Sequence, residues 1–347
     1  MVTSVDGKLF YRNYRKPFYA QIAVSVEIRN LSSFETLYIN LVDALNKKFN
    51  LSFRRKTVDS RFLAEVLAGK EALRKTYIRE FIEKISPQIG RIYVMHTSIP
   101  PSKIPAVKCY GGKEQKEPIE FIKSLTGAYN HCVLWKILDK NYYDFSSRFL
   151  VDFFEGDITR AWEKIVSVSP QMEAYFLGDE CNPTISIADL LCKYVEYELA
   201  EKRLRLGTDQ IRQCFANSPL NVEPVFIDDL SMITPCRKEP IRASKFIHHP
   251  IVFVFCSQQL NKEKEVIKSI GLYDKLLNFA FERHACLKFF NYDNTPVDAT
   301  YMSKGDIFVT IGDKGRSTAK YFIKELGIDA ELYNALKLKS KFKNNNI

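Results

Sequence analysis

Three aspartates that lie far apart along the chain could together hold divalent metal ions. Asp152 stands between apolar neighbours in a stretch typical of a buried strand, where an unpaired carboxylate is costly. Asp189 stands in an apolar stretch typical of a helix, and Asp6 stands near the first predicted strand. Carboxylates from separate elements can hold two metal ions about 4 Å apart, which stabilise the attacking and leaving oxygens of a phosphodiester. The three aspartates therefore suit phosphodiester hydrolysis.

Each aspartate also has a purely structural explanation. Asp6 precedes Gly7, and this pair is common in hairpin turns. Ser186 and Asp189 have the spacing of a capping box at a helix start. Asp152, for its part, could pair with an arginine, for which the candidates are Arg148 and Arg160. These alternatives stay open at the level of the sequence.

The charge distribution indicates an anionic partner. The 347 residues carry 51 Lys and Arg against 41 Asp and Glu, a formal net charge of +10. Residues 1–150 have 25 basic and 14 acidic side chains, whereas residues 151–200 have 3 basic and 10 acidic. An acidic segment in a basic chain is what a metal-dependent nuclease needs, although a solvated acidic helix would look the same. We expect the partner to be nucleic acid, with DNA and RNA both open.

The elements that would position these acids alternate between strands and helices, which predicts an α/β fold with a mixed sheet flanked by helices. Strands are expected at 2–11, 18–28, 90–98, 148–154 and 174–178, and helices at 30–49, 61–85, 118–138, 158–166 and 185–205. The stretch 219–224 is interpreted as a linker or a crossing loop. A smaller α/β unit follows, with strands at 251–256, 286–290 and 306–311 and helices at 262–282 and 317–326. We divide the chain into a domain at 1–217 and a C-terminal accessory domain at 218–347.

Three motifs carry a resemblance to a known family. Asp6 precedes the strand FYAQIAVSVE, the segment LVDFFEGDITRAWEKI carries Asp152, and AYFLGDECNPTISIADLLCKYVEYEL carries Asp189 in its Ala-Asp-Leu core. In this order of elements, residues 1–205 resemble the RNase H-like fold, and in particular a family of RNase H-like domains of unknown function found near mobile elements and defence systems.

The resemblance implies Mg²⁺- or Mn²⁺-dependent phosphodiester hydrolysis with Asp6, Asp152 and Asp189 as metal ligands. It leaves a fourth ligand open among Glu27, Glu155, Asp157, Asp179 and Glu180. Gly7 stands where the family usually has a glutamate. A catalytically inactive protein that binds nucleic acid or another partner on the same scaffold is therefore the alternative.

Three basic residues are candidates for nucleic-acid binding. Lys193 lies one helical turn beyond Asp189 and could face a phosphate, or it could be an ordinary exposed lysine. Arg74 and Lys75 lie on the basic face of the predicted helix at 61–85.

Other features narrow the class of protein. No apolar run reaches the roughly 18 residues of a membrane helix, and residues 1–8 do not look like a secretory signal. None of the 8 cysteines forms a CxxC pair, so we expect buried thiols, no zinc site and a cytoplasmic protein without a membrane partner. The glycine-containing turn at 312–318 leaves a nucleotide-binding switch in 251–330 as a third hypothesis. The sequence makes no prediction of oligomeric state.

Overall fold

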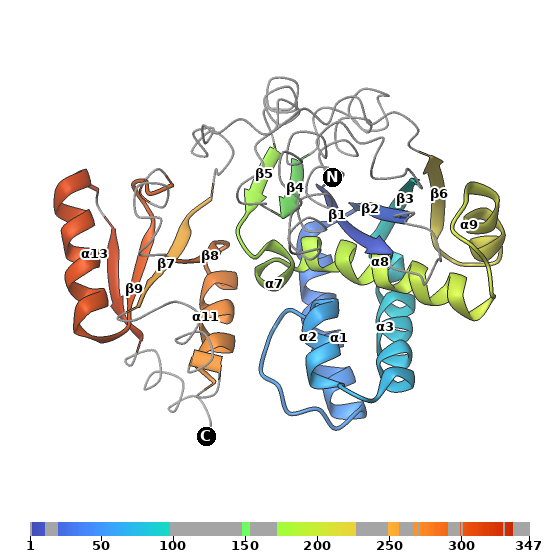
Figure 1. The fold of residues 1–347 in the computed structure, drawn as a ribbon, viewed down its shortest axis with the longest axis horizontal. Helices are drawn as coiled ribbons and strands as arrows, with labels where there is room; N and C mark the ends of the chain where they lie inside the picture. The colour runs from blue at the N-terminus through green and yellow to red at the C-terminus, as the bar shows by residue number, and fades with distance from the viewer. Residues whose placement is uncertain are drawn as a thin grey trace, which may run out of the picture.

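The computed structural model describes two β-sheets with helices packed against them (Figure 1). The described residues are 2–10, 20–97, 148–152, 172–226, 249–256, 267–268, 271–290, 299, 301–328 and 330–335. The helices expected at 118–138 and 158–166 lie outside the described residues.

The first sheet has six strands in the order β5-β4-β1-β2-β3-β6. Strands β1 (Val2–Phe10), β2 (Ala20–Ile28) and β3 (Ile89–Thr97) form an antiparallel meander. Strand β4 (Arg148–Asp152) runs parallel to β1, and β5 (Met172–Tyr175) runs parallel to β4. Strand β6 (Asn221–Phe226) runs parallel to β3 at the other edge. The predicted fold class, an α/β fold with a mixed sheet flanked by helices, is confirmed.

The helices around this sheet are α1 (Leu31–Lys48), α2 (Ser60–Val66), α3 (Glu71–Ile85), α7 (Gly178–Cys181), α8 (Pro183–Glu201) and α9 (Thr208–Phe215), with a 3₁₀ turn at Ser86–Gln88. Helix α8 lies across β1 and β2, and α1 and α3 pack against α8 (Figure 1). Asn182 starts α8 by accepting a hydrogen bond from the Thr184 N–H at 2.9 Å, and Pro183 occupies the first helical position. Among the helices that the structure describes, none is long and apolar enough to cross a membrane.

The stretch predicted as one helix over 61–85 is two helices, α2 and α3. They are separated by Gly69, whose φ of 74° places it in the left-handed region. An α-helix cannot continue through this conformation, which glycine adopts without steric cost. The apolar periodicity that runs through both segments conceals the break.

The expected linker at 219–224 is wrong, because residues 221–226 form β6. Pro224 opposes Val94 in this strand. Proline lacks an N–H and is normally confined to edge strands, and β6 is an edge of its sheet. The first sheet therefore extends past residue 217. The division of the chain into two domains stays a prediction, and the second sheet begins at Ile251.

The second sheet is entirely parallel, with the strand order β10-β9-β7-β8. Its elements are β7 (Ile251–Phe255), α11 (Leu272–Phe281), β8 (Cys286–Phe289), β9 (Ile307–Thr310), α13 (Gly312–Leu326) and β10 (Glu331–Asn334). Every residue of β7 is buried, as expected for a parallel strand covered on both faces.

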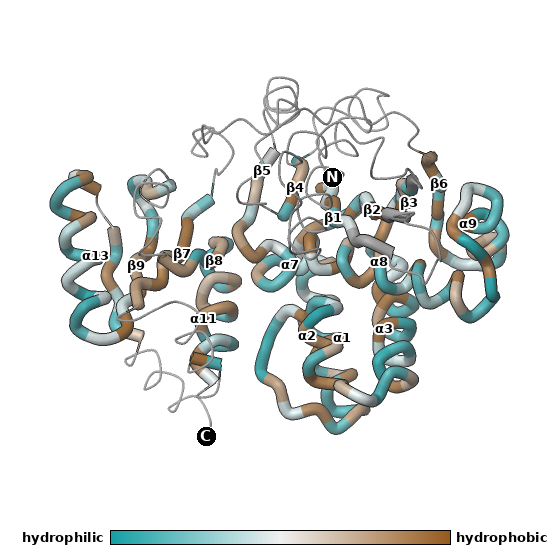
Figure 2. Tube along the Cα trace, in the orientation of Figure 1, coloured by the Kyte–Doolittle hydropathy of each residue, from teal (hydrophilic) through white to brown (hydrophobic). Residues whose placement is uncertain are grey.

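Helices α11 and α13 cover opposite faces of this sheet (Figure 1). Val252 and Val254 belong to the same apolar cluster as Leu276 of α11, whereas the Phe255 ring lies 6.3 Å from the Phe322 ring of α13. In Figure 2 hydrophilic and hydrophobic residues alternate along α3 and α13, which is typical of helices with one buried face.

Candidate active site

Asp6 and Asp152 lie side by side on the first sheet. Strands β1 and β4 pair in parallel with Val5 opposite Val151, so the two aspartates occupy the next position along each strand. Adjacent strands lie about 4.8 Å apart, and residues in register point to the same face. The Ser4 hydroxyl, two positions before Asp6, donates to the Thr184 carbonyl of α8. Asp6 and Asp152 therefore point to the face that α8 covers.

Asp6 is a strand residue and not a turn residue. It opposes Val24 in the antiparallel pairing of β1 with β2, so the hairpin-turn explanation of Asp6 and Gly7 is wrong. Its exposed fraction is 7%. An aspartate this deeply buried inside a strand requires interaction with polar groups around it.

The Asp152 carboxylate is held by the start of α7. Its Oδ1 atom accepts a hydrogen bond from the Gly178 N–H at 2.7 Å. A Cβ atom on Gly178 would lie 3.0 Å from this oxygen and 2.8 Å from Cδ1 of Ile185, so only glycine allows this approach. Arg148 binds Glu173 at 2.8 Å. Arg160 lies outside the described residues.

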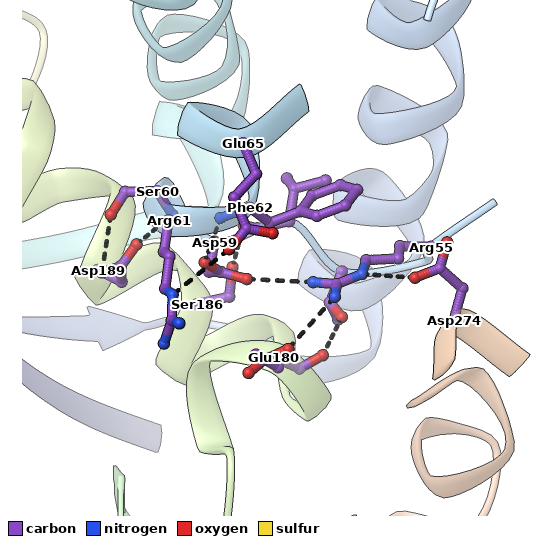
Figure 3. A network of polar contacts seen from close by, with 12 residues as sticks. Arg55, Asp59, Ser60, Arg61, Phe62, Glu65, Glu180, Ser186, Asp189 and Asp274 are labelled. Atoms are coloured by element: carbon purple, nitrogen blue, oxygen red, sulfur yellow. Dashed lines mark hydrogen bonds and ion pairs between the residues drawn. The ribbon is translucent and has the colours of Figure 1, made fainter. Parts of the chain in front are cut away.

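The Asp189 carboxylate is held by the start of α2. It accepts hydrogen bonds from the Ser60 N–H at 2.6 Å and from the Ser60 hydroxyl at 3.2 Å (Figure 3). The capping-box explanation is wrong, because Asn182 caps α8 and Asp189 lies well inside the helix. The Ser186 hydroxyl binds the Val58 carbonyl at 2.7 Å. Asp189 thus faces segment 58–60 across the surface of α8.

Asp179, the second residue of α7, is affected electrostatically by all of these acids. Burial raises the pKa of Asp179 well above its usual range, and the charges of Asp152, Asp59, Asp189 and Asp6 raise it further. All four acids are close enough to disfavour a negative charge on Asp179. The described structure therefore gathers aspartates from β1, β4, α7, α8 and the start of α2.

Asp59 belongs to this cluster although sequence analysis did not single it out. It caps α2 by accepting from the Phe62 N–H at 2.8 Å, and an aspartate before a helix is an ordinary N-cap. Burial raises its pKa to about 6, with Asp189 and Glu180 adding to the shift and the Phe62 N–H and Arg55 opposing it. Only the tertiary structure reveals that this cap lies beside Asp189.

The candidates for a fourth metal ligand have different surroundings in the structure. Asp179 lies among the other acids, whereas Glu27 accepts from the Arg91 N–H at 3.1 Å and Glu180 faces Arg55 at 3.3 Å. Glu155 and Asp157 lie outside the described residues. Among the candidates that the structure describes, Asp179 is the one whose pKa is raised by Asp6, Asp152 and Asp189.

The donor set suits Mg²⁺ or Mn²⁺, since both ions prefer oxygen ligands and a cation would offset the repulsion around Asp179. In the part of the chain that the structure describes, however, no three His, Cys, Asp or Glu side chains are grouped so as to hold a metal ion. The backbone donors Gly178 and Ser60 orient two of the carboxylates. Binding an ion would require the acids to draw closer together.

The three predicted nucleic-acid-binding residues meet around Tyr197 of α8. The Arg74 Nε–H donates to the Tyr197 hydroxyl at 2.8 Å. The Nζ atoms of Lys193 and Lys75 lie 5.1 and 5.4 Å from the centre of the Tyr197 ring. Asp189, Lys193 and Tyr197 recur every fourth residue and share one stripe of α8, with about 6 Å of axial rise per step. The basic cluster of Arg74, Lys75 and Lys193 therefore lies further along α8 than Asp189, toward the C-terminal end of the helix.

Both lysines of this cluster form ion pairs on their own helices. Lys193 binds Glu196 at 2.5 Å, and Lys75 binds Glu71 at 3.3 Å. The Lys193 side chain is 24% exposed and the Lys75 side chain is 40% exposed, so neither pair is deeply buried. Ion pairs in contact with water contribute roughly 0–1 kcal/mol, which leaves these lysines able to exchange a carboxylate for a phosphate.

Comparison with known proteins finds a family model and a relative that match most of the chain. The family model described as Domain of unknown function (DUF8203) matches residues 4–244. An uncharacterized protein of Archaeoglobus fulgidus is 23% identical over 326 residues, which cover 91% of this chain and 92% of that protein.

Two solved structures are also similar to this chain. The complex of PCNA with RNase HII from Archaeoglobus fulgidus matches with 14% identity and a TM-score of 0.31, covering 63% of this chain and 80% of that one. Bst-RNase HIII in complex with Mn²⁺ matches with 11% identity and a TM-score of 0.28, covering 68% and 66%. Both TM-scores are below 0.5, so neither match bears on the chemistry of this chain.

Proposed function

This chain belongs to the DUF8203 family, and we propose that it is a Mg²⁺- or Mn²⁺-dependent nuclease that hydrolyses phosphodiester bonds of nucleic acid. Asp6, Asp152 and Asp189 would bind the metal ions, with Asp179 as the fourth ligand. The observation that carries this proposal is the position of Asp6 beside Asp152 in parallel register, within the electrostatic field that they share with Asp179 and Asp189.

The chain's own groups would prepare this site. The Gly178 and Ser60 N–H groups, at the starts of α7 and α2, orient the carboxylates of Asp152 and Asp189. These hydrogen bonds would fix the directions in which the remaining oxygen lone pairs point. When bound, a divalent cation would favour deprotonation of water and stabilise the charge on the leaving oxygen. Lys193, Arg74 and Lys75 would bind phosphates of the strand beyond the cleavage position.

The test is cleavage of single-stranded and double-stranded DNA and RNA in the presence of Mn²⁺. Asp152→Asn and Asp189→Asn are expected to abolish cleavage while nucleic-acid binding is retained. Asp209→Asn is the matched control, because Asp209 is 89% exposed and lies outside the cluster. Cleavage by both site variants at the wild-type rate would refute the proposal.

A second function, binding of nucleic acid or another partner without catalysis, is favoured by one observation. Backbone donors already bind Asp152 and Asp189, which satisfies these acids in part without a cation. Under this alternative, wild-type protein binds nucleic acid and releases no products from any of the four substrates, and titration with Mn²⁺ gives no heat.

A further inference from the structure

Helix α11 of the C-terminal unit binds segment 54–56, which lies just before Ser60, the residue that donates hydrogen bonds to Asp189. The Asn278 side chain accepts from the Lys56 N–H at 2.9 Å and donates to the Arg54 carbonyl at 2.8 Å. The oxygen and the nitrogen of the Asn278 amide therefore both hydrogen-bond to the backbone of segment 54–56. Lys56 also forms an ion pair at 2.7 Å with Glu282, the C-cap residue of α11, but the two side chains are 36% and 37% exposed, so this pair contributes little.

Within this segment, the Arg55 guanidinium lies between acids of both units (Figure 3). Its Nε atom is 2.8 Å from Asp274 of α11, and its terminal nitrogens are 3.3 Å from Asp59 and 3.3 Å from Glu180. The side chain of Arg55 is only 4% exposed, so water screens these contacts weakly.

Aromatic rings complete the surroundings of this guanidinium. Its central carbon lies 3.9 Å from the centre of the Phe62 ring and 5.3 Å from that of Tyr273. The Tyr273 hydroxyl donates to Glu180 at 2.9 Å. The planar, five-donor fork of arginine can serve three acids and two rings at once, which a lysine ammonium cannot.

The Arg55 contacts reach the candidate active site by two short routes. Asp59 precedes Ser60, whose N–H and hydroxyl hold the Asp189 carboxylate. Glu180 follows Asp179 in α7, the helix whose first N–H binds Asp152. A shift of the Arg55 segment would therefore move donors to two of the proposed metal ligands.

We infer that Arg55 is a positioning residue and that α11, through Asp274 and Asn278, makes the C-terminal unit part of the candidate active site. Arg55 pairs with Asp59 and Glu180, whereas the acids proposed to bind a cation are Asp6, Asp152, Asp179 and Asp189. This inference rests on the proposed nuclease function and assigns the C-terminal unit a role in it.

The test compares Asp274→Ala with Glu282→Ala in the full chain. Both changes remove an acid that pairs with segment 54–56. Asp274 of α11 pairs with Arg55, whereas Glu282, at the C-cap of α11, pairs with Lys56. Asp274→Ala is expected to increase hydrogen exchange of the Ser60 and Phe62 amides and to weaken Mn²⁺ binding in calorimetry, each about tenfold, the size of one lost hydrogen bond to a charged group. Glu282→Ala is expected to leave both quantities unchanged.

Kinetics separate positioning from substrate binding. Asp274→Ala should lower kcat with little change in KM, because Asp274 lies on α11 and acts through Arg55. Asp274→Asn, which keeps an acceptor for the Arg55 Nε–H, should restore most of kcat and of the Mn²⁺ affinity. Arg55→Lys should lower both kcat and the Mn²⁺ affinity, because lysine cannot bridge the three acids.

Two results would overturn the inference, and they can be told apart from failure of the proposed function. Equal amide exchange and equal Mn²⁺ affinity in wild type and Asp274→Ala would refute a positioning role while the nuclease proposal stands. Equal losses in Glu282→Ala would reduce the effect to general weakening of the contact between units. Wild-type protein that binds no Mn²⁺ and cleaves no nucleic acid would instead refute the proposed function.

Discussion

Replacing Gly178 by alanine tests the central geometry of the candidate site. The new methyl carbon would lie 2.8 Å from Cδ1 of Ile185, 3.0 Å from Oδ1 of Asp152 and 3.2 Å from Cβ of Tyr175. Ordinary contacts of a Cβ atom fall at 3.4–4 Å. The start of α7 must therefore move away by several tenths of an ångström, and the 2.7 Å hydrogen bond to Asp152 must lengthen.

The expected cost follows from these two effects. Overpacking of a close-packed region costs about 1–3 kcal/mol, and loss of a hydrogen bond to a charged group costs roughly 1.5–3 kcal/mol. The two losses overlap because one movement causes both, so Gly178→Ala should lower the free energy of unfolding by about 2–4 kcal/mol. Urea denaturation measures this directly, and Mn²⁺ titration of the folded variant should show weaker binding.

Gly207→Ala is the matched control. A Cβ atom there would meet Oε1 and Cδ of Gln210, the far end of a flexible side chain that can turn away. Its φ of −179° is extended backbone that any residue adopts, so we expect a change below about 1 kcal/mol. Gly178→Ala protein with wild-type stability and wild-type Mn²⁺ affinity would refute the close approach of α7 to Asp152.

Three further predictions concern charge. Asp179→Asn should raise the melting temperature at neutral pH, because a neutral amide removes the repulsion among the acids. The same variant should abolish cleavage. A lower melting temperature would contradict the repulsion. Lys193→Ala and Lys75→Ala should each reduce by about one the slope of log affinity for nucleic acid against log salt, with unchanged slopes excluding phosphate contacts. His96 is buried, and burial lowers its pKa from 6.5 to about 4. The unfolded chain therefore takes up a proton near pH 6.5 while the folded protein does not, so stability should fall by about 3 kcal/mol as pH drops from 6.5 to 4. Denaturation curves of wild type and His96→Phe across this range check it, since the variant should lack that loss.

Local patterns in the sequence were enough to predict most of the elements. The alternation of strands and helices predicted the α/β class, because each local pattern reflects one face of an element that must be buried. The same local patterns do not identify the cap of α1. Asn30 is the cap, because its side chain accepts the hydrogen bond from the Ser33 N–H at 3.0 Å, although Ser32 and Ser33 are also residues of the capping type. Side chains with similar capping ability follow one another there, and the sequence does not rank them.

The composition of the candidate site was also partly predictable. Asp152 and Asp189 stand among apolar residues, and the cost of burying a charge makes such positions conspicuous in any sequence. Asp59 and Arg55 stand in a mixed polar stretch, where an acid and a base are ordinary surface residues. Both are buried, with exposed fractions of 2% and 5%. Arg55 binds Asp274 of α11, which lies 219 residues further along the chain, and Asp59 lies beside Arg55.

The charged residues, the apolar stretches, the class of fold and the acids worth testing can all be identified from the amino-acid order. The register that sets Asp6 beside Asp152, the approach of Gly178 to Asp152 and the contact of α11 with Arg55 exist only in the folded chain. Strand register and helix docking depend on the sum of many weak contacts between distant segments. No single residue or short motif records that sum.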